Sequence, residues 1–179
     1  MHILDQAGRM LSDYPDLETH SRGVALLALN AAKALRFSEP EEFAIAGYMH
    51  DLGKTTWPPE LFVKSPLTEH DRSIIRIHPI VGENLVVQTW PDVPDRIKSL
   101  IRYHHERPGG RGYPDGLTDP GVEILLLSAC DVFDAMTTAR PYRKNGEALS
   151  VEEALFEVAR FAPAQVVAAL ATAVLKKGA

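Results

Sequence analysis

The sequence predicts an all-α protein, because its apolar residues recur mostly at helical spacing and few stretches alternate as strands do. Val24, Leu27 and Ala31, for example, fall on one face of a helix. Polar residues that begin helices precede several of these apolar runs. The 179-residue length suits one domain with one sizeable core. We therefore expect a single helical domain over residues 1–179.

Eight helices are expected, and capping and breaking residues set their boundaries. Three pairs match the capping box, in which Ser or Thr is followed three residues later by an acidic side chain. These pairs are Ser38 with Glu41, Ser150 with Glu153 and, in a weaker form, Thr68 with Asp71. Gly53 and the Pro58-Pro59 pair are expected to end the third helix. The expected helices cover residues 2–12, 18–36, 39–51, 68–89, 93–105, 122–138, 150–160 and 164–176.

The longest break in helical periodicity covers residues 106–121, which hold five Gly, three Pro and two Asp. Such a composition predicts a loop, because Gly and Pro adopt the backbone angles of turns. Long loops in compact domains often carry function. A turn without function remains the alternative for Gly112, Tyr113 and Pro114.

Charge and cysteine content restrict the function. The net charge of -5 argues against binding to duplex nucleic acid, which depends on clustered cationic side chains. A small phosphorylated ligand remains compatible, since bound metal ions add positive charge locally. Cys130 is the only cysteine, which excludes an intramolecular disulfide and a zinc ribbon. With no apolar run of the roughly 20 residues that span a bilayer, we expect a cytoplasmic protein without a membrane segment.

Histidine and aspartate residues suggest a metal site. His50 and Asp51 are adjacent at the expected end of an apolar helix. Imidazole and carboxylate together suit Fe, Mn, Ni or Zn, and a carboxylate can bridge two ions. A hydrogen-bonded structural pair is an equal alternative for these two residues alone. His78, His104 and His105 add further nitrogen ligands.

Asp131 lies within the apolar run 124–136, where a carboxylate is costly to bury unless it is paired, protonated or metal-bound. A buried salt bridge is the alternative. Asp134, one turn later, is placed to hold a ligand or Lys54 by hydrogen bonding. His20 completes the set. Asp16 lies four residues before it. It is a candidate either for metal binding or for an N-terminal helix charge that the helix dipole stabilises.

These residues appear in the order of a known family. The run His50-Asp51-Leu52-Gly53-Lys54, then His78-Pro79, His104-His105-Glu106-Arg107 and Gly112-Tyr113-Pro114, resembles the HD-GYP subgroup of the HD phosphohydrolases. Asp131 to Met136, followed by Arg140-Pro141-Tyr142-Arg143, resembles its helix and following turn. The likeness covers about residues 16–160. It implies an HD-type helical bundle with a GYP loop that hydrolyses cyclic di-GMP to linear pGpG and, in some members, GMP.

The resemblance also implies a role for each residue. One metal would be held by His20, His50, Asp51 and Asp131, and a second by Asp51, His78, His104 and His105, with Fe or Mn favoured. Asp16 would support a third metal, as in some members. Asp51 and Lys54 would act in catalysis. Lys54, Tyr113, Arg140 and Arg143 would contact substrate phosphates or bases. Two close cations can also activate a bridging water, so no protein nucleophile is needed.

Some positions depart from the family pattern and leave alternatives open. Pro108 and Gly109 replace an aromatic residue and an Asp, and Gly23 stands where Arg is common. One alternative is a catalytically weak or inactive signalling module, and another is an HD phosphohydrolase for a different phosphoester. A GGDEF-type or sensor protein is an expected partner, and a homodimer is compatible with the sequence. Trp57 is expected near the pocket mouth, although packing is the more common role of such a residue.

Overall fold

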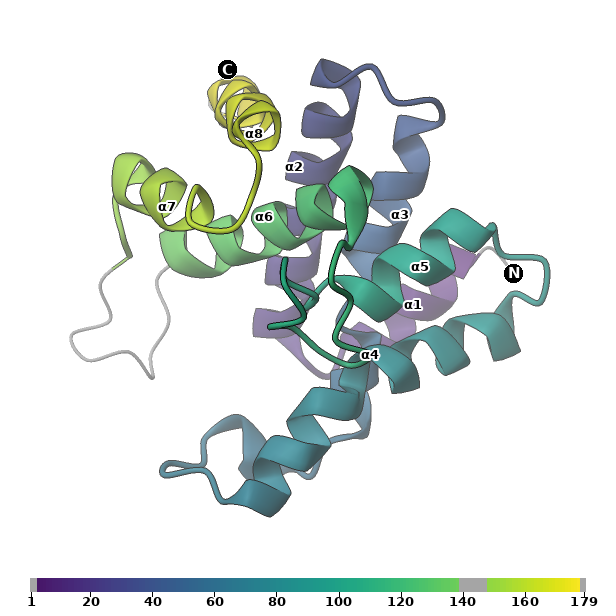
Figure 1. Ribbon diagram of the computed structural model, residues 1–179. Coiled ribbons are helices and arrows are strands. Elements are labelled where there is room, and N and C mark those ends of the chain that lie inside the picture. Colours follow the sequence, from purple (N-terminus) through teal and green to yellow (C-terminus); the bar gives the residue numbers. More distant parts are fainter. Residues whose placement is uncertain (1–2, 139–147, 178–179) are drawn as a thin grey trace.

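The computed structural model describes residues 3–138 and 148–177, and Figure 1 shows that this part of the chain is built from helices. The eight expected helices are confirmed, and no strand occurs within the described ranges. Two short 3-10 helices, η1 and η2, follow α3. In chain order the elements are α1 (Ile3–Leu11), α2 (Pro15–Ala34), α3 (Pro40–Met49), η1 (Leu52–Thr56), η2 (Pro59–Phe62), α4 (Glu69–Thr89), α5 (Asp95–Tyr103), α6 (Gly121–Thr137), α7 (Val151–Val158) and α8 (Ala164–Lys177).

Two of the three expected capping boxes are confirmed. At α4 and α7, Thr68 and Ser150 accept a hydrogen bond from the backbone N–H three residues later, and the acidic partner bonds back. The Ser38 prediction is wrong, because α3 begins at Pro40 and Glu39 precedes it in the left-handed region with φ 52°. Proline at the first helical position has no N–H that needs a cap. Arg96 donates to the Ser38 hydroxyl instead.

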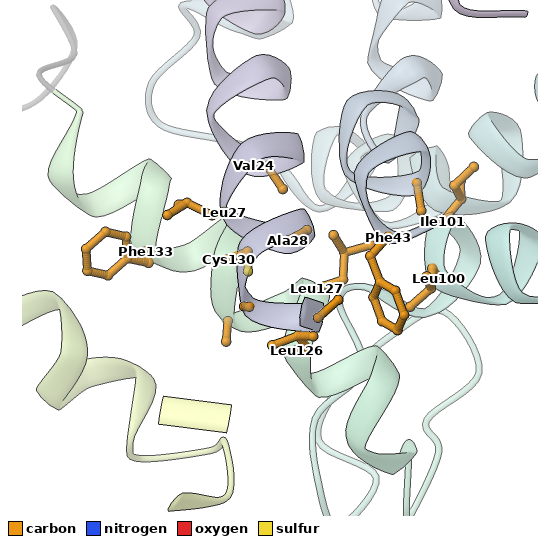
Figure 2. Packing of buried hydrophobic residues seen from close by; sticks show 14 of the residues in the cluster. Val24, Leu27, Ala28, Phe43, Leu100, Ile101, Leu126, Leu127, Cys130 and Phe133 are labelled. Atoms are coloured by element: carbon orange, nitrogen blue, oxygen red, sulfur yellow. The ribbon is translucent and has the colours of Figure 1, made fainter. Parts of the chain in front are cut away.

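The hydrophobic core lies between α2, α3, α5, α6 and α8. Figure 2 shows side chains of α2, α3, α5 and α6 pointing toward one another, among them Leu27, Phe43, Leu100 and Leu127. All four are fully buried. Burial of each such side chain contributes roughly 1.5–3 kcal/mol to the stability of the folded state. This packing fixes the positions of the helices that carry the site.

The helix α4 extends away from the rest of the bundle at its N-terminal end, with the preceding connection beside it (Figure 1). Its central part packs against η1 and α5. The loop of residues 106–120, which we call the GYP loop, follows α5 and leads into α6. None of the helices in the described ranges combines the length and the apolar character needed to cross a membrane.

Candidate metal centre

The candidate ligands are carried by helices or helix ends that are far apart in the chain. His20 lies on α2, His78 on α4 and Asp131 on α6. The expected helix over 39–51 ends at Met49, so that His50 and Asp51 stand between α3 and η1. His104 caps the end of α5, and His105 follows it. These side chains are buried, except for the partly exposed His105.

Asp51 is fully buried at the centre of these residues. Its Oδ1 lies 3.1 Å from His78 Nε2 and 3.8 Å from His104 Nε2. One ligand atom from each of Asp51, His78, His104 and His105 falls within 4.8 Å of the others. This spacing is compact enough for a single ion with three imidazole ligands and one carboxylate ligand.

The second oxygen of Asp51 faces a different set of side chains. Asp51 Oδ2 lies 2.6 Å from Lys54 Nζ, 3.3 Å from His50 Nε2 and 4.0 Å from His20 Nε2. Asp51 with His20 and His50 also forms a group within 4.8 Å, and Asp131 Oδ1 lies 3.7 Å from His50 Nε2. Asp51 therefore belongs to two ligand groups, as a bridging carboxylate does.

Backbone hydrogen bonds orient three of the imidazoles in the same way. Each Nδ1 pairs with the carbonyl three residues earlier: His50 with Gly47 at 2.7 Å, His78 with Ile75 at 2.6 Å and His104 with Ile101 at 2.7 Å. Because a carbonyl only accepts, Nδ1 must carry the proton and donate it. The Nε2 atoms of these rings then face Asp51 and one another.

In this arrangement, hydrogen-bond acceptors face other hydrogen-bond acceptors. His78 Nε2 lies 3.3 Å from His104 Nε2, and neither His50 Nε2 nor Asp51 Oδ1 has a hydrogen-bond partner although both atoms are buried. A buried polar atom without a partner costs free energy. A cation between the Nε2 atoms and the carboxylates removes that cost, so the donor set fits divalent metal ions.

Electrostatics keep most of these imidazoles neutral. Burial is the main cause that lowers the pKa of His104 and His78, and it lowers the pKa of His105 to about 3. Neutral imidazole is the form that binds a metal. His50 differs: burial lowers its pKa, but Asp51 and Asp131 outweigh burial and raise it to about 10. The buried carboxylates around His50 therefore favour positive charge at this position.

His20 is held by two carboxylates of α6. Its Nε2 lies 3.0 Å from Asp131 Oδ1, and its Nδ1 lies 2.8 Å from Asp134 Oδ2. A Cβ on Gly23 would come within 2.1 Å of Asp134 Oδ1. Gly23 thus leaves the space that the Asp134 carboxylate occupies beside His20.

Asp16 lies in the first turn of α2, which begins at Pro15 rather than at the expected residue 18. The side chain is exposed. It is not a member of the ligand groups found among the described residues. The structure therefore places Asp16 one turn from His20 but outside the buried cluster.

The GYP loop is organised by Glu106, which is fully buried. Its carboxylate accepts hydrogen bonds from the backbone N–H groups of Asp115, Gly116 and Leu117 at 2.8–2.9 Å. A Cβ on Gly112 would lie 2.4 Å from the Glu106 backbone, so the loop returns directly over this residue. In the sequence, Glu106 is distinguished only as part of the motif that resembles the family. Its position directly after two histidines was the available signal.

The candidate substrate residues lie around the cluster. The ring of Tyr113 stacks on His105 with centroids 4.7 Å apart, and Lys54 pairs with Asp51. Arg140 and Arg143 lie outside the described residues.

The chain is similar to known proteins in sequence and in fold. The model of the HD domain family matches residues 6–160. The chain belongs to the HD domain family. Its likeness to proteins named cyclic di-GMP phosphodiesterases agrees with the HD-GYP subgroup. It is 34% identical to one from Pseudomonas aeruginosa over 134 residues, which is 72% of this chain, and 34% identical to one from Thermotoga maritima over 156 residues, which is 83% of this chain.

A third relative, a cyclic di-GMP phosphodiesterase response regulator of Xanthomonas campestris, is 35% identical over 129 residues, or 69% of this HD domain chain. The chain spans 32%, 42% and 33% of the lengths of these three relatives. Among solved structures, the HD domain of the L. monocytogenes phosphodiesterase PgpH is similar with a TM-score of 0.68 and 18% identity, covering 96% of both chains. Bd1817, an HDG"Y"P protein from Bdellovibrio bacteriovorus, has a TM-score of 0.67 at 23% identity and covers 89% of this chain and 52% of its own. These structures show the shared fold.

Proposed function

We propose that this HD domain is a metal-dependent phosphodiesterase that hydrolyses cyclic di-GMP to linear pGpG, with GMP as the candidate further product. The observation that carries the proposal is the buried Asp51, which shares its two oxygens between two histidine-containing ligand groups. Relatives named cyclic di-GMP phosphodiesterases support the substrate. A similar HD domain solved in complex with cyclic di-AMP supports the binding of cyclic dinucleotides by this fold.

The chain would hold two divalent ions, with Fe or Mn favoured. His20, His50, Asp51 and Asp131 would bind one ion, and Asp51, His78, His104 and His105 would bind the other. Asp16 is the candidate for a third. Bound ions supply an activated water and neutralise charge on the phosphoryl oxygens. The ligand chemistry accords with this choice, because mixed imidazole and carboxylate sets suit such metals.

The remaining residues of the site would position the substrate. Lys54 Nζ lies 2.6 Å from Asp51 Oδ2, and from there it would stabilise charge that develops on the phosphate. Tyr113 offers a ring face for a base, and Arg140 and Arg143 would donate to phosphate or guanine edges. Asp134 holds His20 in the orientation that its ligand role needs.

The environment of the protein follows from the same proposal. Cyclic di-GMP is a signalling molecule of the bacterial cytoplasm, so a cytoplasmic location is inferred, and the free, buried Cys130 is compatible with it. A GGDEF-type or sensor protein would supply the regulatory input, and a homodimer would be one way to receive it.

The test is anaerobic purification with metal analysis, followed by incubation with cyclic di-GMP and chromatography of the products. Two or more metals per chain with release of pGpG or GMP is the expected result. His78→Ala should abolish product, whereas His70→Ala should not, because His70 is exposed on α4. Bound metal without hydrolysis of cyclic di-GMP would favour a signalling module or a phosphohydrolase that acts on another phosphoester. Competition among cyclic di-GMP, cyclic di-AMP and 3'3'-cGAMP would define the preferred base.

A further inference from the structure

The indole of Trp57 lies beside the cluster of candidate metal ligands. Trp57 caps η1, and its backbone N–H donates to the Lys54 carbonyl at 3.0 Å. Its ring meets His78 edge-on, with centroids 5.7 Å apart and an interplanar angle of 87°. Lys54 Nζ lies 5.6 Å from the ring centroid. Trp57 thus contacts both a candidate metal ligand and the cation that pairs with Asp51.

Neighbouring aromatic rings hold Trp57 in place. Phe62 lies 5.3 Å from Trp57 and 5.4 Å from Tyr14 between ring centroids. The Tyr14 hydroxyl donates to the Thr55 carbonyl at 3.0 Å, which ties this row of rings back to η1. Trp57 itself stays partly exposed. A ring fixed in this way loses little further freedom when a ligand stacks on it.

Tyr113 also lies beside His78. The His78 and Tyr113 rings also meet edge-on, with centroids 6.4 Å apart and an angle of 73°. His78 therefore has one aromatic residue from η1 and one from the GYP loop as neighbours. A cyclic dinucleotide presents two bases around its sugar–phosphate ring, and bases stack favourably on aromatic side chains.

We propose that Trp57 is a base-stacking residue that gives this site a preference for purine cyclic dinucleotides, with Tyr113 serving the other base. The inference rests on the proposed phosphodiesterase function and deepens it. The two rings and the ligand groups around Asp51 would then bind different parts of the substrate. The cluster would take the scissile phosphate, and each ring would take one base.

The first experiment compares Trp57→Leu and Trp57→Phe with the wild type on cyclic di-GMP and cyclic di-UMP. Leu keeps an apolar contact with Phe62 but cannot stack, so KM for cyclic di-GMP should rise roughly tenfold or more, while kcat stays within about twofold. KM for cyclic di-UMP should change much less, because a pyrimidine offers a smaller face. Trp57→Phe should recover most of the loss, and metal content should stay unchanged.

A structural role for Trp57 predicts a different pattern. If the ring only supports Lys54 or His78, Trp57→Leu would change KM equally for both substrates or would lower the metal content. Either result would overturn the proposal. Trp90→Phe serves as the matched control. Trp90 packs against the core at the end of α4, so this variant should keep the kinetics of the wild type.

Fluorescence gives a direct readout, because Trp57 is the only tryptophan left in the Trp90→Phe variant. Rapid mixing with cyclic di-GMP should quench the emission before turnover, and inorganic phosphate should not. Hydrolysis without quenching would overturn the Trp57 proposal alone. A wild-type protein that neither binds nor hydrolyses a cyclic dinucleotide would overturn this proposal together with the function on which it rests.

Discussion

The buried side chain of Asp51 is held in its charged form by its neighbours. Burial raises the pKa of its carboxyl, but His50 and Lys54 outweigh burial and hold the pKa well below its usual value. The carboxylate therefore stays charged inside the protein. It can do so because cationic partners surround it, and metal ions would serve the same purpose more strongly.

Asp51→Ala should lower metal occupancy and abolish turnover, because one carboxylate serves both ligand groups. We expect metal affinity to fall by more than about a hundredfold, since even residues that only orient metal ligands account for ten- to a hundredfold. Metal analysis after dialysis measures the effect. Asp92→Ala is the matched control, because Asp92 is exposed in the connection between α4 and α5. Full metal occupancy in the Asp51 variant would contradict a bridging role.

Asp134 is expected to act through His20. Asp134→Asn weakens the hydrogen bond to His20 Nδ1, and we expect metal affinity to fall about ten- to a hundredfold. Gly23→Ala should act in the same direction, because its Cβ would displace the Asp134 carboxylate. Metal titration of both variants tests this coupling. Wild-type affinity in both would show that His20 needs no such support.

At the scale of single elements, periodicity and capping predicted where helices exist better than where they begin and end. The helix over residues 39–51 was expected to continue through the ligands, but it ends at Met49 and η1 begins at Leu52. After the break, η1 approaches α4 closely. A Cβ on Gly53 would meet the His78 carbonyl at 2.0 Å. That constraint comes from a distant segment, which local sequence signals do not reveal.

Glu106 should control the order of the GYP loop. Glu106→Gln removes the charge that three backbone N–H groups share, and hydrogen bonds to a charged group contribute about 1.5–3 kcal/mol each. Hydrogen–deuterium exchange of the 115–117 amides should accelerate, and KM for the dinucleotide should rise while the metals are retained. Unchanged exchange would mean that the loop is held by other contacts.

The start of α4 depends on the Asp71 carboxylate. Its pKa is lowered by hydrogen bonds to Lys64 and Thr68. A lowered folded-state pKa stabilises the protein above the unfolded value, near pH 4 for Asp, and this stabilisation is lost as the pH falls further. Asp71→Asn should therefore lower the melting temperature by a few degrees at pH 7. The difference should shrink below about pH 4. A difference that stays constant with pH would exclude an electrostatic cause.

At the scale of the whole molecule, the site exists only because distant segments meet. His20 and Asp131 are 111 positions apart in the chain yet lie 3.0 Å from each other. Residue chemistry alone brought these two residues together with His50, Asp51 and the other histidines as candidate ligands, and resemblance to the family assigned them to two metals. Neither approach gave Trp57 or Glu106 a role. Their significance depends on ring contacts and backbone hydrogen bonds that only the folded chain displays.

Metal binding should therefore stabilise the entire domain. The ligand groups draw on α2, α4, α6 and the ends of α3 and α5, and an unfolded chain presents no such set. Binding to the folded state alone adds about 4 kcal/mol when free metal exceeds the dissociation constant a thousandfold, which corresponds to a rise of roughly 10 °C in a protein of this size. Calorimetry of chelated and reloaded protein measures this shift. The shift should disappear in Asp51→Ala and persist in Asp92→Ala. Equal melting temperatures with and without metal would indicate that the helices form a complete core around an optional ion.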